Sequence, residues 1–357
     1  MKKSNLYLVL VLGLLAYATS LAQDGKLSAQ KTFIDYFQPT PQSGSLSTDV
    51  WGADVVGPRD PKNGLESDDK QWNYWDGNII KASDGKYHLF GSRWGQASGF
   101  GHWPTSQAVH AVSANLFGPY VDKGLCWPDN QGGRGHNVTA LVLPDGRYAI
   151  VVSETRPGDV FVSNSLDGPW VHLGTIQVAD GPFKKLGKMS NVAVMVRPDG
   201  NFEIIARSGA IWISKNGILG PYEIQGPCIY PKITGLKLQN LEDPVIWYSG
   251  GFYHIIVNSW SSRKAYHLTS VDGINAWKYQ GLAYDPTANF IRYTDGTINH
   301  WSNLERSSVF LENGHIVALT LAATDLPKGG KQNPRGAISK ILVLPFNGAA
   351  LDRDTKP

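Results

Sequence analysis

Residues 75–85 read Trp-Asp-Gly-Asn-Ile-Ile-Lys-Ala-Ser-Asp-Gly, and similar stretches recur at 136–146, 190–200, 241–251 and 304–314. Each stretch places a polar residue nine positions before a turn glycine: Asp76, Asn137, Asn191, Glu242 and Glu305. These polar positions are separated by 61, 54, 51 and 63 residues. Repeats of this length that are built from strands indicate an array or a propeller.

Every repeat shows the same order of predicted strands. An apolar strand runs into an Asp-Gly, Gly-Gly or Asn-Gly turn, which is a strong hairpin signal, and a second strand follows. A third strand then leads to a loop with Gly-Pro-Tyr or Gly-Pro-Trp at 118–120, 168–170 and 220–222, or Asn-Ala-Trp at 275–277, and to a short fourth strand. The fifth repeat is less regular, with strands near 307–311, 315–321 and 336–344. This order predicts an all-β fold, a five-bladed β-propeller with four-stranded antiparallel blades.

The chain divides into three predicted parts. Residues 1–22 read as a signal peptide, with Lys2 and Lys3, a short apolar core and a small-residue cleavage site ending at Ala22. We therefore expect export to the periplasm or the outside of the cell, with no membrane anchor after cleavage. Residues 23–64 are expected to wrap the propeller, and residues 65–357 to form it.

The net charge and the cysteine content limit the kinds of partner and cross-link that the chain can have. A net charge of +3 is too small for a nucleic-acid-binding surface. The two cysteines, Cys126 and Cys228, occupy comparable places in non-adjacent repeats, which should lie too far apart for a disulfide. Both are predicted to be free, and the sequence leaves the oligomeric state open.

Inner strands of a closed propeller converge on its axis, so the five polar positions should line one central pocket. Asp76, Glu242 and Glu305 would place three carboxyl groups there, and such groups repel one another and raise at least one pKa. Asn137 and Asn191 are better explained as residues that hydrogen-bond inside the channel, with substrate contact as a second role.

A pair of carboxyl groups that flank a bond performs glycoside hydrolysis, one as an acid and one as a base or nucleophile. Aromatic rings near the predicted strand ends suit the apolar face of a sugar. The candidate substrate-binding residues are Trp75, Arg93, Trp94, His136, Asn137, Asn191, Trp260, Trp301 and Arg306, with Trp72 and Trp103 nearby.

No histidine shows metal-ligand spacing, so no metal site is predicted. The histidine considered for a catalytic role in hydrolysis is His300, which lies five residues before Glu305 and could reach the same pocket. No cofactor is required, although a channel of this kind can hold a calcium ion.

By these residues the chain resembles the five-bladed propeller glycoside hydrolases of families 43 and 117. The resemblance covers nearly all of residues 65–345 and depends on Asp76, on Glu242-Asp243-Pro244 and on Glu305-Arg306. The family 43 pattern implies Asp76 as general base and Glu242 as acid, but places an aspartate where this chain has Asn191. The family 117 pattern implies Asp76 as base, Asp243 as supporting carboxylate, and His300 or Glu305 on the acid side.

The fourth repeat leaves a choice between adjacent residues. Counting from the turn glycine selects Glu242, whereas the Asp-Pro sequence of these families selects Asp243. Neighbouring strand residues face opposite ways, so one of the two is expected to face the pocket unless a bulge intervenes.

The sequence therefore predicts an exported glycoside hydrolase that acts on a plant or algal glycan. The predicted mechanism is inversion, with Asp76 activating water and an acid among Glu242, Glu305 and His300. Two alternatives stay open: a propeller that binds sugar without cleaving it, and a lyase for uronic acid polymers with His136, Tyr74 and Arg93 as candidates.

Overall fold

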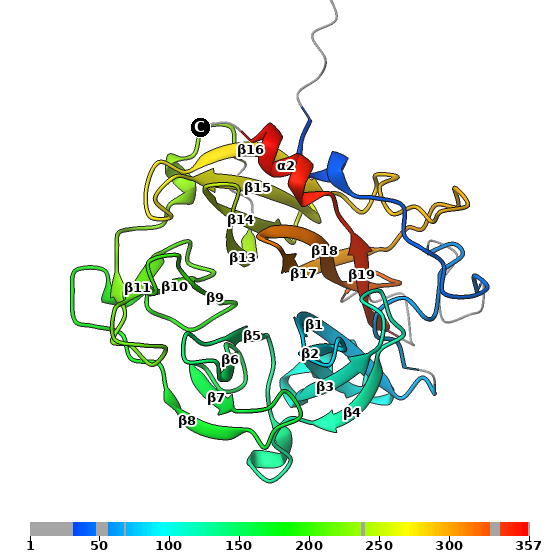
Figure 1. Cartoon of the computed structure of the whole chain (residues 1–357), viewed down its shortest axis with the longest axis horizontal. Helices are drawn as coiled ribbons and strands as arrows, with labels where there is room; N and C mark the ends of the chain where they lie inside the picture. The colour runs from blue at the N-terminus through cyan, green and yellow to red at the C-terminus, as the bar shows by residue number, and fades with distance from the viewer. Residues whose placement is uncertain (1–30, 48–55, 68, 237–239, 329–335, 356–357) are drawn as a thin grey trace, which may run out of the picture. The chain divides into compact units, whose positions relative to one another are not determined.

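The chain forms five antiparallel β-sheets that follow one another in sequence and stand around a common axis (Figure 1). The computed structural model describes residues 31–47, 56–67, 69–236, 240–328 and 336–355. Inner strands of neighbouring sheets contact each other around the ring, and the first also contacts the fifth. The predicted all-β, five-bladed propeller is thereby confirmed. The predicted signal peptide, residues 1–22, lies outside the described residues.

Four sheets contain four strands each, in sequence order from the axis outward. The first two sheets are β1 (Trp72–Lys81), β2 (Tyr87–Gly95), β3 (Gln107–Ser113), β4 (Val121–Leu125), and β5 (Val138–Val142), β6 (Tyr148–Val152), β7 (Asp159–Ser163), β8 (Val171–Thr175). The next two are β9 (Ala193–Val196), β10 (Phe202–Ile205), β11 (Ile211–Ser214), β12 (Glu223–Ile224), and β13 (Leu241–Ser249), β14 (Phe252–Ser259), β15 (Lys264–Ser270), β16 (Lys278–Tyr284).

Helices are short in the described residues. The 3₁₀ helices are η1 (Phe33–Tyr36), η2 (Gln96–Ser98), η3 (Phe100–Thr105), η4 (Gln131–Gly133), η5 (Lys184–Leu186) and η6 (Tyr230–Lys232), and the α-helix is α2 (Gly348–Asp354). None of the described helices has the length and apolar character needed to cross a membrane.

Apolar side chains fill the space between neighbouring sheets. Val151 and Val160 of the second sheet pack in one cluster with Ile204 and Trp212 of the third, and all four are fully buried. A strand inside a blade contacts another sheet on both faces, so its sequence is apolar almost throughout. Cys126 and Cys228 are both free, as predicted.

The fifth sheet has three strands among the described residues: β17 (Asn303–Glu312), β18 (His315–Thr324) and β19 (Ser339–Pro345). Its outer edge is covered by the N-terminal segment. Leu65 exchanges two backbone hydrogen bonds with Ile341, and the Asn63 side chain both donates to Val343 O and accepts from Val343 N. A segment that precedes the first sheet thus closes the ring and satisfies an exposed strand edge.

Buried charges fix this closure. The Lys340 ammonium is fully buried and donates to Glu66 (2.7 Å) and to the backbone carbonyl of Asp60 (3.1 Å). Arg59 contacts the same Glu66 carboxylate at 2.6 Å. Because two cations share one buried carboxylate, the junction between residues 59–66 and β19 depends on all three side chains.

Replacing Lys340 with Met keeps the side-chain volume and removes the charge. We expect the free energy of unfolding to fall by about 3 kcal/mol, because the variant breaks a buried ion pair. The measurement is chemical denaturation, with Lys86→Met as control, since Lys86 forms an exposed pair with Asp84. Equal stability of the two variants would show that the buried cluster does not hold the ring closed.

Candidate functional site

Five residues in the first half of the inner strands or just before them share a left-handed backbone: Asp76 (φ 69°), Asn137 (53°), Asn191 (44°), Asp243 (50°) and Arg306 (47°). This conformation is uncommon outside glycine and is most accessible to Asn and Asp. Its recurrence once per sheet identifies the equivalent positions at the axis. They are the predicted ones in the first three sheets, but lie one residue later than Glu242 and Glu305 in the last two.

The difference comes from shorter hairpins, partly offset by a longer strand segment: Ser249 lies six positions after Asp243, whereas Lys81 lies five positions after Asp76. Five residues separate the paired Lys81 and Tyr87 in the first sheet, whereas only two separate Ser249 and Phe252 in the fourth. The hairpin of the fifth sheet is equally short. Counting back from the turn glycine therefore loses the register in these two sheets.

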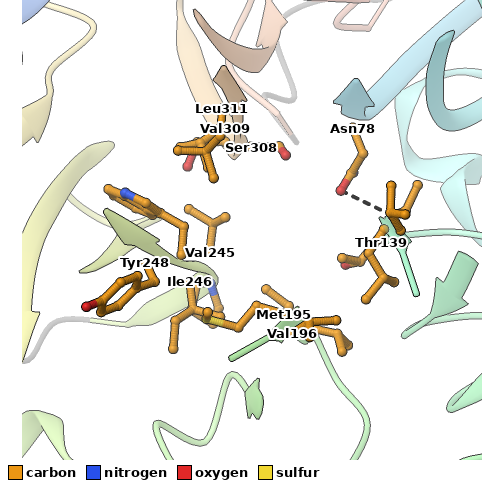
Figure 2. Close-up of a pocket in the computed structure, with 18 of the residues that line it drawn as sticks. Asn78, Thr139, Met195, Val196, Val245, Ile246, Tyr248, Ser308, Val309 and Leu311 are labelled. Carbon is orange, nitrogen blue, oxygen red and sulfur yellow. Dashed lines mark hydrogen bonds between the residues drawn. The ribbon is translucent and has the colours of Figure 1, made fainter. Parts of the chain in front are cut away.

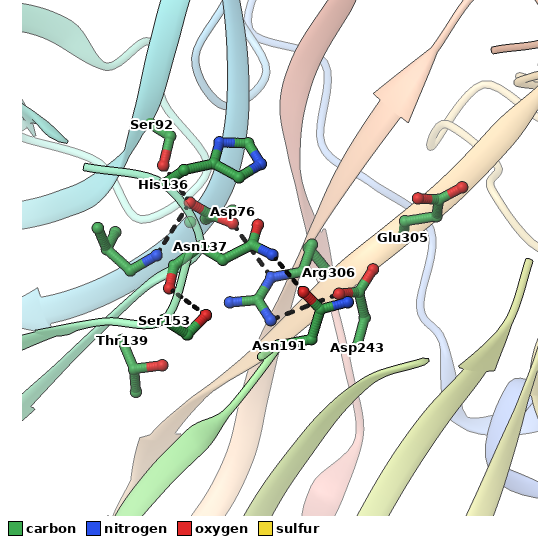
Figure 3. Close-up of polar contacts among 12 residues, drawn as sticks. Asp76, Ser92, His136, Asn137, Thr139, Ser153, Asn191, Asp243, Glu305 and Arg306 are labelled. Carbon is green, nitrogen blue, oxygen red and sulfur yellow. Dashed lines mark hydrogen bonds and ion pairs between the residues drawn. The ribbon is translucent and has the colours of Figure 1, made fainter. Parts of the chain in front are cut away.

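A buried network joins the axis residues (Figure 3). Arg306 Nε donates to Asp76 Oδ1 at 3.1 Å, and Nη1 lies 3.5 Å from Asp243 Oδ1. Asp76 Oδ2 also accepts from Ser92 Oγ and from Val138 N. Asn137 Nδ2 donates to Asn191 Oδ1 at 2.8 Å. One guanidinium thus holds carboxylates of two opposed sheets.

Asp76 is 1% exposed. Burial raises the pKa of its carboxyl, while the Arg306 charge and the Ser92 and Val138 donors act in the opposite direction. With three donors and no exposed surface, this carboxylate occupies the interior of the axis network.

Two cavities lie along the axis on either side of this network. The first, of about 480 Å³, is at the starts of the inner strands. Its lining residues are Trp75, Trp94, Phe100, Gly101, Trp103, His136, Asn137, Glu154, Ser190, Asn191, Arg207, Glu242, Asp243, Trp260, Glu305 and Lys328. The second, of about 380 Å³, extends toward the hairpins and is mainly apolar, with Met195, Val245 and Leu311 in its wall (Figure 2). Asp76 and Arg306 line this second cavity only.

Five predicted substrate-binding or catalytic residues do not line the first cavity: Asp76 and Arg306 of the axis network, and Arg93, His300 and Trp301. Arg93 pairs with Asp122 and lies 4.4 Å from the centre of the Trp72 ring. Trp301 is buried in the core between the fourth and fifth sheets, and His300 is held by its backbone to Val56. The prediction for His300 used its proximity in sequence to Glu305, but the chain between residues 300 and 305 runs from the core to the axis.

Both Glu242 and Asp243 line the cavity, which is the outcome expected from the sequence if a bulge intervened. The pairing of β13 with β14 shifts between Glu242 and Val245, and the left-handed backbone of Asp243 breaks the alternation of the strand. Oxygen atoms of Glu242, Asp243 and Glu305 lie within 4.8 Å of one another.

The carboxyl groups of this cluster have raised pKa values. Burial raises the pKa of Glu242 to about 7, helped by the charges of Asp243 and Glu305 and opposed by Arg207. Burial likewise raises the pKa of Glu305, against the charge of Lys328, which forms an ion pair with it. Burial also raises the pKa of Asp243, against the Arg306 charge. Groups perturbed in this way are typical of functional sites.

The remaining wall is aromatic. Trp260 is 50% exposed and Trp103 37% exposed, and Trp103 stacks on His136 at 4.8 Å. Burial lowers the pKa of His136 to about 3, so its ring is neutral and shares a hydrogen bond with Ser106 Oγ (2.8 Å). Lys328 Nζ lies 5.2 Å from the Trp75 ring centre. Such walls bury apolar faces of a ligand while polar edges find partners.

Sequence reasoning missed Glu154, Arg207 and Lys328. Glu154 and Arg207 come just after the second strands of their sheets, and Glu154 N donates to His136 O. The end of a second strand lies beside the start of the antiparallel first strand. Polar residues just after the second strands could therefore have been predicted to line the same cavity. Lys328 follows β18 by four residues and carries no such signal.

Two groups of side chains have the ligand types of a metal site. Glu242, Asp243 and Glu305 offer oxygen atoms, but the cations Arg207, Arg306 and Lys328 already neutralise them. His88 and His110 lie near Asp167 and share a hydrogen bond of 2.8 Å. The same bonded pair recurs in the fourth sheet as His254 and His267 (2.9 Å), so we attribute it to packing.

Comparison with known proteins gives likenesses at the level of the fold. No protein-family model matches the sequence, and no curated protein matches it. A family 43 β-1,3-galactosidase structure is 15% identical with a TM-score of 0.52, over 79% of this chain and 58% of that chain, so this chain spans less than two thirds of its length. A family 117 glycoside hydrolase from Zobellia galactanivorans is 14% identical with a TM-score of 0.52, over 80% and 88% of the two chains.

A third likeness is to a family 43 β-xylosidase/α-arabinofuranosidase from a compost microbial metagenome, solved with xylotriose. It is 15% identical with a TM-score of 0.53, over 81% of this chain and 96% of that chain. The resemblance to the propellers of families 43 and 117 is therefore confirmed in architecture.

The raised pKa of Glu242 predicts how stability varies with pH. Between pH 4.5 and 7 the folded state binds more protons at this residue than the unfolded state, so its contribution to stability is lost as the pH rises through about 7. We expect Glu242→Gln to flatten the fall in Tm between pH 5 and pH 8, which thermal denaturation measures. Glu312→Gln, which alters an exposed pair with Lys81, is the control. Parallel curves for wild type and Glu242→Gln would contradict the raised pKa.

Proposed function

We propose that this protein is a glycoside hydrolase that cleaves a glycosidic bond in a plant or algal glycan. The observation that carries the proposal is the set of three carboxyl groups with raised pKa values in one cavity with aromatic walls. The likeness in fold to glycoside hydrolases of families 43 and 117 supports the same class.

Glu242 is the proposed general acid. It is protonated below pH 7, and its side chain is 12% exposed, so a leaving oxygen in the cavity can reach its proton. Asp243 and Glu305 are nearly fully buried beside Arg306 and Lys328, and their charges add to burial in raising the pKa of Glu242. An acid with a pKa near the working pH gives efficient proton transfer.

Inversion is the proposed stereochemical course. The members of the carboxyl cluster come from the fourth and fifth sheets and lie on one side of the cavity. Inverting enzymes instead separate acid and base by about 6.5–9.5 Å, with water between the base and the sugar. The base must then be outside the cluster, and Asp76 is the one implied by the sequence resemblance.

The lyase alternative is not supported by the positions of its residues. Tyr74 and Arg93 both contact Asp122, away from the cavity that contains His136. The proposal of export, with cleavage after Ala22, continues to depend on residues 1–22 of the sequence.

Replacing Glu242 with Gln should lower kcat on glycans by about 10²–10⁴-fold, because the leaving sugar no longer receives a proton. Hydrolysis of a 2,4-dinitrophenyl glycoside should fall far less, since that leaving group needs no protonation. The measurement is sugar release from a glycan panel, paired with aryl glycosides.

Glu312→Gln is the control and should be fully active, because Glu312 lies in an exposed pair on the β17–β18 hairpin. Glycan binding without release by the wild type would instead favour a sugar-binding propeller. Equal losses on glycan and activated glycoside would contradict the role of Glu242 as acid.

A further inference from the structure

We infer that Glu154, and not Asp76, is the general base that activates water for the glycosidic cleavage; this inference rests on the proposed hydrolase function. Glu154 is the fourth carboxylate that lines the first cavity, and it does not belong to the cluster of Glu242, Asp243 and Glu305.

Glu154 comes from a different part of the ring than the acid. It follows β6 of the second sheet, whereas Glu242 and Glu305 belong to the fourth and fifth. In the ring of five, the second sheet contacts the first and third, so the fourth and fifth are on the far side of the axis (Figure 1). A sugar in the cavity would therefore have Glu242 on one side and Glu154 on the other, as inversion requires.

The carboxylate of Glu154 is oriented and only half-buried. Its Oε1 accepts from Ser190 Oγ (2.8 Å) and from Asn191 N (2.9 Å). Among the described residues nothing donates to Oε2, and no cation forms an ion pair with this side chain. One oxygen is thus fixed by the protein while the other is available to a water in the cavity.

Asp76 differs in each of these respects. Its two oxygens accept from Ser92, Val138 and Arg306, it is 1% exposed, and it does not line the first cavity. Asp76 borders the second cavity instead, on the other side of the network from the aromatic walls that would hold a sugar. We therefore assign Asp76 as a positioning residue, which holds Arg306 in contact with Asp243.

The step balances without a co-reactant. The oxygen of a water bonds to the anomeric carbon as the bond from that carbon to the leaving oxygen breaks. One water proton passes to Glu154 Oε2, and the Glu242 proton passes to the leaving oxygen. The products are two hydroxyl-terminated sugars, with the configuration at the anomeric carbon inverted.

The test compares Glu154→Gln, Glu154→Ala and Asp76→Asn on a substrate that the wild type cleaves, drawn from a panel of glycans and of 4-nitrophenyl β-galactoside, β-xyloside and α-arabinofuranoside. The Gln variant keeps an oxygen for Ser190 and Asn191, so it should fold with a wild-type Tm. We expect kcat to fall by about 10²–10⁴-fold with little change in KM. Proton NMR should show inverted product from the wild type.

Azide supplies a readout that a structural role would not move. It needs no base to attack the anomeric carbon, so it should restore turnover to Glu154→Ala and yield a glycosyl azide of inverted configuration. For Asp76→Asn and Asp76→Ala we expect lower stability, a smaller loss of kcat than in Glu154→Gln, and no rescue.

The outcomes separate the two proposals. A wild type that cleaves nothing in the panel overturns the hydrolase function. Cleavage by the wild type with Glu154→Gln within tenfold of it, azide rescue of Asp76→Ala instead of Glu154→Ala, or a retained product overturns the role of Glu154 and leaves the hydrolase function standing.

Discussion

The buried guanidinium of Arg306 is the interaction on which the centre of the molecule depends. It lies between Asp76 of the first sheet and Asp243 of the fourth, and both carboxylates are almost fully buried. Removing one partner from such an arrangement leaves an uncompensated buried charge, which is far more costly than loss of a surface pair. The contact therefore fixes how the inner strands of three sheets meet at the axis.

In the first cavity, beside this network, carboxylates outnumber cations. Four carboxylates face the first cavity, and the two cations that face it, Arg207 and Lys328, are each paired with one of them. Arg207, Arg306 and Lys328 offset the repulsion within the cluster of Glu242, Asp243 and Glu305, and protonation of Glu242 lowers it further. Burial, helped by the charges of Asp243 and Glu305, raises the pKa of Glu242 to about 7, which suits it to donate a proton at neutral pH.

The exposed aromatic side chains of the first cavity belong to the connections between strands. Trp103 and Trp260 come from segments that project beyond the sheets, after β2 and after β14. Loops on a rigid scaffold can vary without altering the core, which is why binding residues concentrate there. In this chain the scaffold places charge at the strand starts, and the loops add the walls that would select a ligand.

Much of this could be predicted from the sequence alone, because its signals are local. Hairpin turns, apolar strands and a repeat of 51–63 residues determine a five-bladed propeller, and polar residues at inner-strand starts indicate the axis. Tertiary structure decided the rest. Shorter hairpins, partly offset by longer strand segments before them, moved the axis positions by one residue to Asp243 and Arg306. Which carboxylate is buried beneath an arginine, as Asp76 is, and which is half-exposed in the cavity, as Glu154 is, depends on contacts between sheets that lie far apart in the chain, and local sequence does not encode such distances.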